Sequence, residues 1–231
     1  MWVKICGNTN LEDAQIAVEA GADALGFLFA KSTRRITPID ARSITPHLPA
    51  TVEKIGIFDH ADFEEIVATV EEAGLTGIQL HSSLDPTLSA RLREHFSAKS
   101  AQGQMRILGV IHYSSDLEKQ LRAAHEDSAI DAVLVDSRTA TLLGGTGIRF
   151  DWHAASDSFL PAASRLCLIA AGGLNPDNVG EAISTLRPWG VDVVTGVEAS
   201  PGKKDPARVR SFITNARIAA VKAKLDAPVE V

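Results

Sequence analysis

The sequence predicts an α/β fold in which eight parallel strands, each followed by a helix, close into a barrel. Three observations support this prediction: eight short apolar runs, helical patterns between them, and a weak internal repeat. The chain has 231 residues, and an eighth of that length, about 29 residues, accommodates one strand, one helix and two short loops.

The eight apolar runs are four to seven residues long and apolar at most positions, as is typical of strands buried on both faces of a parallel sheet. In chain order they are Val3–Cys6, Ala24–Phe29, Val52–Phe58, Gly77–Leu80, Ile107–Ile111, Ala132–Val135, Leu166–Ala170 and Val191–Val194.

Helix-start signals lie between these runs. Asn10 is a suitable N-cap for the first helix, which we expect to end at Gly21. Further helices are predicted to open where a proline stands in the first turn, a position that suits its fixed φ. These starts are Pro38, Asp85-Pro86, Asn175-Pro176 and Asp205-Pro206.

The repeat consists of four segments that each enter an even-numbered strand. They are Gly21–Ala24, Gly74–Gly77, Ala129–Ala132 and Gly190–Val193, and they begin 53, 55 and 61 residues apart. Two strand–helix units repeated four times favour a closed (β/α)8, or TIM, barrel over the alternative, an open doubly wound sheet. With no linker in the sequence, we expect one domain over residues 1–231, with its core at about 2–222 and a frayed tail at about 224–231.

Composition and charge exclude several classes of protein. An apolar content of 45% is too high for a disordered chain. A net charge of −6 gives no broad positive field for nucleic acid or an anionic membrane surface. Two cysteines and no run of 18 apolar residues predict a protein of the reducing cytoplasm without a membrane span.

Barrels of this type carry their chemistry in the loops after the strands. Gly172-Gly173 follow the seventh run and Thr195-Gly196 follow the eighth, which is where such barrels usually bind phosphate through free backbone N–H groups. A third glycine-rich segment, Gly144–Gly147, follows the sixth run. The alternative is that these glycines only make tight turns, but three clusters at one barrel mouth favour phosphate.

Two residues at strand ends are candidates for acid–base chemistry. Cys6 ends the first run; it is either a small buried hydrophobe or a base whose thiolate is favoured by nearby dipoles or cations. Cys167, inside the seventh run, is assigned to the buried hydrophobes. Asp136 follows the sixth run, where partial desolvation favours the protonated form of a carboxyl group; the alternative is a cap for the turn at Ser137.

Further candidates follow other runs. Arg34 and Arg35 follow the second run, and one of them can hold a carboxylate in a bidentate pair. The other arginine is then expected to be solvated or to form an ion pair. His81 follows the fourth run. We count His81 and Gly145 as additional substrate-binding candidates. No pair of His, Cys or carboxylate residues has metal-ligand spacing, and no hydrolytic triad is apparent.

Ordered motifs from residue 4 to about residue 205 resemble the phosphoribosylanthranilate isomerase family of tryptophan biosynthesis. In the first half they are Lys4–Asn10, Gly21–Phe27, Ser32–Ile36 and Gln79–His81. In the second half they are Leu134–Ser137, Gly144–Gly147 with Phe150–Trp152, Ala171–Val179, Thr195–Glu198 and Gly202–Asp205.

The resemblance implies an Amadori rearrangement of N-(5-phosphoribosyl)anthranilate to the 1-deoxyribulose 5-phosphate product. It implies Cys6 as the general base, Asp136 as the general acid and Arg34 as the ligand of the anthranilate carboxylate. The loops at Gly172-Gly173 and Thr195-Gly196 match its phosphate site. It implies no cofactor or metal, a small anionic phosphosugar as the partner, and a monomer or homodimer.

The chain departs from the common family pattern at Asp59-His60, Ser82 and His112-Tyr113. None of these departures touches Cys6 or Asp136. Two other functions remain as alternatives: a related isomerase of the histidine pathway, whose barrels use a carboxylate where this chain has Cys6, and an inactive phosphate-binding barrel.

Overall fold

The computed structural model describes residues 1–82, 84–97, 104–136, 152–163 and 166–225. These residues form eight parallel strands that close into a barrel in chain order, with the last strand paired to the first. The strands are β1 (Trp2–Ile5), β2 (Ala24–Leu28), β3 (Glu53–Phe58), β4 (Gly77–Leu80), β5 (Arg106–His112), β6 (Ala132–Asp136), β7 (Leu168–Ala171) and β8 (Gly190–Val193). The predicted fold and all eight runs are confirmed, with ends that differ by at most two residues.

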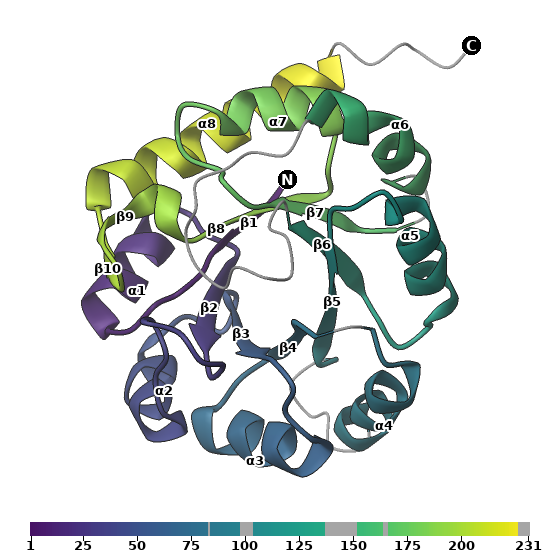
Figure 1. Ribbon diagram of the computed structural model, residues 1–231. Coiled ribbons are helices and arrows are strands. Elements are labelled where there is room, and N and C mark those ends of the chain that lie inside the picture. Colours follow the sequence, from purple (N-terminus) through teal and green to yellow (C-terminus); the bar gives the residue numbers. More distant parts are fainter. Residues whose placement is uncertain (83, 98–103, 137–151, 164–165, 226–231) are drawn as a thin grey trace.

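A helix follows each strand, and together the helices surround the barrel (Figure 1). The helices are α1 (Leu11–Glu19), α2 (Pro38–Ile44), α3 (Phe63–Ala73), α4 (Pro86–Ser97), α5 (Leu117–Glu126), α6 (Trp152–Ala163), α7 (Val179–Leu186) and α8 (Pro206–Leu225). Two short 3₁₀ helices, η1 (Thr45–His47) and η2 (Thr195–Val197), and a small hairpin of β9 (Glu198–Ser200) and β10 (Lys203–Lys204) complete the described elements.

The predicted cap of the first helix is confirmed, because the Asn10 side chain accepts a hydrogen bond of 2.8 Å from the Asp13 N–H. Pro38 stands in the first turn of α2, where Thr37 and Asp40 form a capping box. The helix expected at Asn175-Pro176 begins later, at Val179. The side chain of Asn175 accepts from the N–H groups of residues 177 and 178 and so forms a turn before the helix.

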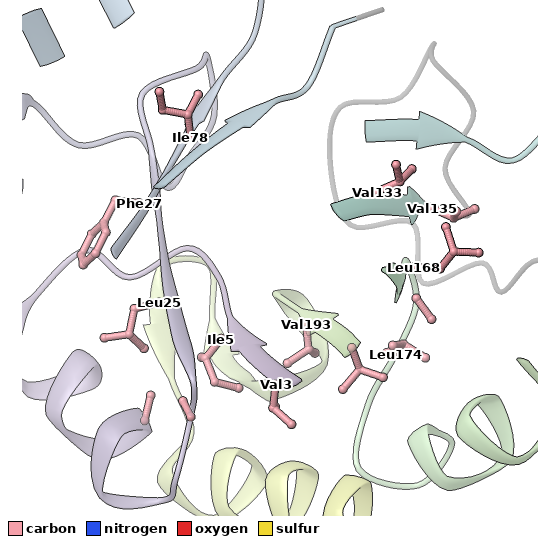
Figure 2. Packing of buried hydrophobic residues seen from close by; sticks show 14 of the residues in the cluster. Val3, Ile5, Leu25, Phe27, Ile78, Val133, Val135, Leu168, Leu174 and Val193 are labelled. Carbon is pink, nitrogen blue, oxygen red and sulfur yellow. The ribbon is translucent and has the colours of Figure 1, made fainter. Parts of the chain in front are cut away.

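The core has two layers, because successive side chains of a strand point to opposite faces. One cluster fills the inside of the barrel: Trp2, Ala24, Ile55, Leu108, Val110, Ala132, Leu134, Ile169 and Ala171. The neighbouring positions of the strands pack against the helices in a larger cluster. Figure 2 shows members of the larger cluster from several strands, among them Val3, Leu25 and Val193.

The internal repeat has a physical basis in three of its four copies. The residue before each even-numbered strand accepts a hydrogen bond from a main-chain N–H of the preceding strand. The pairs are Asp23 with Val3 (2.7 Å), Thr76 with Lys54 (2.8 Å) and Asp131 with Ile107 (2.7 Å). The fourth segment differs from the prediction, because β8 begins at Gly190, Asp192 lies within the strand and its side chain pairs with Lys4.

The prediction that Cys167 is buried inside the seventh strand is also wrong. Cys167 lies just before β7, is partly exposed and packs against the inner cluster. The pairing of β7 with β6 begins one residue later, at Leu168. Among the described residues, no helix is long and apolar enough to cross a membrane.

Candidate active site

The carboxyl ends of the strands surround a cavity of about 180 Å³. Residues from the ends of six strands reach it, together with the loop after β2. Its described lining includes Cys6, Leu28, Ala30, Lys31, Ser32, Thr33, Arg34, Ile57, Asp59, Gln79, His81, Leu134, Asp136, Asp192 and Val194. The structure therefore brings four of the predicted site residues, Cys6, Arg34, His81 and Asp136, to one cavity.

Cys6 follows β1, and Asp136 ends β6. These strands are three places apart around the closed sheet, so a thiol and a carboxyl group enter the cavity from different sides. Both residues are almost completely buried, with exposed fractions of 3% and 2%. A ligand in the cavity would therefore meet two groups that can exchange protons, in a site from which most water is excluded.

The Cys6 side chain rests on the neighbouring strand because Gly26 has no side chain there. A Cβ atom on Gly26 would lie 2.5 Å from the Cys6 Sγ atom. On the other side, Gly7 has a φ of 77° and leaves room for the Arg34 side chain, whose Cδ atom would lie 2.9 Å from a Cβ atom. The two glycines thus allow Cys6 and Arg34 to pack at the mouth.

A buried polar cluster (Lys4, Gln79 and Asp192) lies next to Cys6 inside the barrel. The Lys4 ammonium donates hydrogen bonds to the Gln79 Oε1 atom at 2.9 Å and to the Asp192 Oδ1 atom at 2.8 Å. Lys4 is fully buried. Although burial alone would lower the pKa of Lys4, the Asp192 carboxylate and Cys6 outweigh it, so the pKa of Lys4 is raised and the side chain stays charged.

The environment of Cys6 acts on its pKa in both directions. Burial has the largest effect and raises the pKa of the thiol, while the charge of the Lys4 ammonium lowers it. Asp192 raises the pKa and Lys204 lowers it. The net result is a pKa above the usual thiol range. Once formed, the thiolate is therefore a strong base with a cation beside it.

The sequence predicted a functional role for Arg34 or Arg35, and the structure separates the two. Arg34 is buried against the cavity, whereas Arg35 is exposed. The Arg34 guanidinium donates to both carboxylate oxygens of Glu198, from Nε at 2.8 Å and from Nη2 at 2.6 Å. These hydrogen bonds hold the pKa of Arg34 above its usual value. Glu198 thus fixes the orientation of the guanidinium, whose Nη1 group makes a long contact of 3.4 Å with the Thr33 hydroxyl.

Lys204 completes a second buried charged group with Arg34 and Glu198. Its ammonium donates to the Cys6 carbonyl oxygen at 2.5 Å and to the Glu198 Oε1 atom at 3.2 Å. Burial lowers the pKa of Lys204. Burial of Glu198 by itself would raise its pKa, but the hydrogen bond from Arg34 and the two nearby cations outweigh it, so the pKa lies below its usual value.

Sequence reasoning missed the roles of Lys4, Gln79, Asp192, Glu198 and Lys204. A signal was present for the first three, because each is a polar residue at an inward-facing position of an otherwise apolar strand. No comparable signal marked Glu198 and Lys204, which reach Arg34 from the hairpin after β8.

The four predicted phosphate-binding residues are not among the described residues that line the cavity. They lie in two loops that touch each other. Gly172 and Gly173 have φ angles of 84° and 65°, which glycine adopts without strain. A Cβ atom on Gly196 would lie only 1.9 Å from the Leu174 carbonyl oxygen. Only glycine permits this approach of the loop after β8 to the loop after β7.

His81 and His112 extend the site toward Asp136. The centroids of their rings lie 5.4 Å apart, and His112 pairs in register with Asp136 on the adjacent strand. Gly145 and the segment Gly144–Gly147 fall outside the described residues, as does the tail from residue 226. Within the described residues, no three His, Cys, Asp or Glu side chains come together to hold a metal ion.

Comparison with known proteins agrees with this geometry. The family model of N-(5'phosphoribosyl)anthranilate (PRA) isomerase matches residues 3–215. An N-(5'-phosphoribosyl)anthranilate isomerase from Citrifermentans bemidjiense is 40% identical over 93% of this chain and 96% of its own length. One from Thermotoga maritima is 40% identical over 93% of this chain and 98% of its own.

Solved structures agree as well. The crystal structure of phosphoribosyl anthranilate isomerase from Thermotoga maritima superposes with a TM-score of 0.80 and 37% identity, and covers 94% of this chain and 98% of its own. A structure of such an isomerase in complex with reduced 1-(o-carboxyphenylamino)-1-deoxyribulose 5-phosphate has a TM-score of 0.77, with 37% identity and the same coverage. The chain therefore belongs to the N-(5'-phosphoribosyl)anthranilate isomerase family.

Proposed function

We propose that this chain catalyses the Amadori rearrangement of N-(5'-phosphoribosyl)anthranilate to 1-(o-carboxyphenylamino)-1-deoxyribulose 5-phosphate, a step of tryptophan biosynthesis. Membership of the family supports the reaction. The observation that carries the mechanism is that Cys6 and Asp136 line one buried cavity, which supplies both a base and an acid.

In this mechanism Asp136 is the general acid. Its carboxyl group gives a proton to the ring oxygen of the ribose, the bond from that oxygen to C1 breaks, and the anthranilate nitrogen forms a double bond to C1. Cys6 then removes the proton from C2 as a thiolate, and the electron pair moves to form an enolamine. Tautomerisation of the enolamine gives the ketone. The reaction requires an acid for the opening of the ring and a base for the removal of the C2 proton.

Two anchors hold the substrate between these groups. We assign the anthranilate carboxylate to Arg34, whose guanidinium is oriented by Glu198 beside the cavity. We assign the phosphate to the main-chain N–H groups of the loops at Gly172-Gly173 and Thr195-Gly196, since these loops touch through Gly196. His81 and Gly145 are proposed as further substrate contacts. Anchors at both ends of the substrate fix the reacting atoms, which lowers the entropic cost of each step.

The test is the turnover of phosphoribosylanthranilate by the purified protein, followed as the loss of anthranilate fluorescence. We expect activity in the wild type, and a loss of about 10²-fold or more in Cys6→Ser and in Asp136→Asn, the scale of lost acid–base groups. The matched control is Cys167→Ser, which replaces the other free cysteine outside the cavity and should keep wild-type turnover. An inactive wild type, or full activity in either site variant, would refute the mechanism.

We also propose that the enzyme acts in the cytoplasm as a monomer or homodimer and binds no nucleic acid or cofactor. One solved family structure, with 37% identity to this chain, describes monomers generated from a dimeric isomerase of Thermotoga maritima. Light scattering coupled to gel filtration measures the oligomeric state directly. A mass above that of a dimer would contradict the proposal.

A further inference from the structure

We propose that Lys4 is a positioning residue that stabilises the thiolate form of Cys6, and that Asp192 and Gln79 fix Lys4 for this task. The inference rests on the proposed role of Cys6 as the base. It assigns a task to a fully buried ammonium that the acid–base steps themselves do not use.

The first argument is that the stability of the barrel does not explain Lys4. Removing an ammonium and a carboxylate from water is costly, and well-packed apolar side chains usually fill such a layer at no loss of stability. The layer below is apolar in this way, with Trp2, Ile55 and Ile169 among its members. The buried polar cluster interrupts this packing at the wall of the cavity, which Gln79 and Asp192 line.

The second argument is geometric. Lys4 lies in β1 and Cys6 comes two residues later, where its main-chain N–H still bonds to Val193 of β8, so the two side chains face the same side of the sheet. The Lys4 ammonium has three N–H donors. It donates to Gln79 at 2.9 Å and to Asp192 at 2.8 Å, and both of these residues line the cavity together with Cys6. Gln79 and Asp192 come from β4 and β8, so two further strands fix the ammonium beside the sulphur.

The third argument concerns the charges around the sulphur. Asp192 disfavours the thiolate and Lys204 favours it, but Lys204 lies at the Cys6 carbonyl oxygen and is engaged by Glu198. Asp136, Asp59 and His81 line the same cavity, and Arg34 stands at its edge. Among these groups, Lys4 is the cation with the largest effect on the thiol, and it opposes the effect of burial.

The test measures the thiolate itself. Iodoacetamide alkylates thiolates, so its rate at Cys6 as a function of pH, followed by peptide mass spectrometry, reports the fraction of thiolate. Cys167 in the same molecule is the internal reference. In Lys4→Met we expect the midpoint of the Cys6 profile to move up by about one pH unit and the rate at pH ~7.5 to fall about tenfold. The rate at Cys167 should not change.

Steady-state kinetics give the second readout. In Lys4→Met we expect kcat to fall about tenfold or more, with KM within about threefold, and the rise of kcat/KM with pH to shift upward with the alkylation profile. Lys54→Met is the matched control. Lys54 is another buried lysine on a strand of the barrel, but its ammonium donates to the Pro49 carbonyl oxygen and not to residues that line the cavity with Cys6. Lys54→Met should leave the pH profiles of Cys6 alkylation and of kcat/KM unchanged.

Lys4→Met leaves Asp192 buried without its cation, and this variant can fail to fold. The double variant Lys4→Met/Asp192→Asn removes both charges and keeps the test possible. Because Lys4 affects the thiol more than Asp192 does, the double variant should lie between the wild type and Lys4→Met. Alkylation profiles that coincide with the wild type in both variants would overturn the role of Lys4.

The outcome is separable from that of the proposed function. If Cys6→Ser retains turnover, Cys6 is not the base, whatever the alkylation profile shows. If Cys6→Ser is inactive while Cys6 in the Lys4 variants is alkylated as in the wild type, the role of Cys6 as the base is supported and the positioning role of Lys4 is refuted. A lower kcat in Lys4→Met with an unchanged alkylation profile would assign Lys4 a purely structural role and contradict the inference.

Discussion

At the scale of single residues, the site depends on charges that are paired before any substrate arrives. Arg34 is held by Glu198, and Glu198 in turn contacts Lys204. A guanidinium fixed along its Nε–Nη2 edge loses little conformational entropy when a carboxylate binds to its remaining N–H groups. This arrangement favours Arg34 over the exposed Arg35 as the ligand of the anthranilate carboxylate.

We therefore expect Arg34→Met to lower kcat/KM by about 10- to 100-fold, mainly through KM, because a charge-assisted hydrogen bond is worth roughly 1.5–3 kcal/mol. Arg35→Met is the matched control and should stay within about twofold of the wild type, a change of less than ~0.5 kcal/mol. Steady-state kinetics on both variants check this expectation. A larger effect in Arg35→Met than in Arg34→Met would assign the anthranilate carboxylate to Arg35.

Glu198 gives a prediction about pH. Its pKa is lower in the folded protein than its usual value, so its stabilising effect is full above the unfolded pKa of about 4.3 and is lost as the pH falls through the folded pKa. Glu198→Gln should destabilise the protein by about 3–5 kcal/mol at neutral pH, since it leaves two buried cations uncompensated, and should weaken the loss of stability in acid.

Urea unfolding between pH 3 and 7 measures this dependence, with Glu64→Gln as the control. Glu64 pairs with Arg91 at 3.4 Å, but both side chains are largely exposed, so this variant should follow the wild-type curve. Equal acid dependence of the wild type and Glu198→Gln would show that Glu198 does not contribute.

At the scale of elements, the sequence predicted the strands well and the loops poorly. Continuous apolar runs such as Ile107–Ile111 identify strands because a strand buried on both faces has few polar positions to obscure it. Cys6 and Asp136 could be found because strand ends are where such barrels place their chemistry. Glu198 and Lys204 could not, because their partner Arg34 is more than 160 residues away in the chain and only the closed barrel brings them together.

The contact between the loops after β7 and β8 gives a prediction for an element. Gly196→Ala would place a methyl group 1.9 Å from the Leu174 carbonyl oxygen and 2.9 Å from the Asn175 Cα atom, so the two loops must separate. We expect a loss of about 1–3 kcal/mol in the free energy of unfolding. If these loops bind the phosphate, KM should rise as well.

Gly180→Ala is the control for this variant. Gly180 lies in α7, and an added Cβ atom would lie 3.8 Å from the Ala219 Cβ atom, an ordinary van der Waals contact. Alanine is favoured over glycine inside helices by about 1 kcal/mol, so this variant should be neutral or more stable, with an unchanged KM. Chemical unfolding and kinetics of the pair separate backbone crowding at the loop contact from the general effect of adding a methyl group.

At the scale of the whole molecule, closure joins the two ends of the chain. β1 pairs with β8 over four residues, and α8 packs beside α7 and reaches α1 (Figure 1). The buried side chains of α8 follow a helical period: Val209, Phe212, Ile213 and Ala216. Beyond Ala216 the described side chains are partly or largely exposed, as at Ile218 and Val221. We propose that the chain is one domain whose core reaches about residue 222.

This proposal predicts different effects at the two ends of α8. Phe212→Ala should lower the free energy of unfolding by about 3–5 kcal/mol, because it removes a fully buried aromatic ring from the layer that covers the junction of β1 and β8. Val221→Ala, at an exposed position of the same helix, is the matched control and should change it by less than about 0.5 kcal/mol.

Truncation after Leu225 should leave Tm and turnover at the wild-type level, since the buried stripe of α8 ends nine residues earlier, at Ala216. Thermal and urea unfolding of the three variants measure these changes, and a truncation as harmful as Phe212→Ala would place the tail in the core and contradict the proposed boundary.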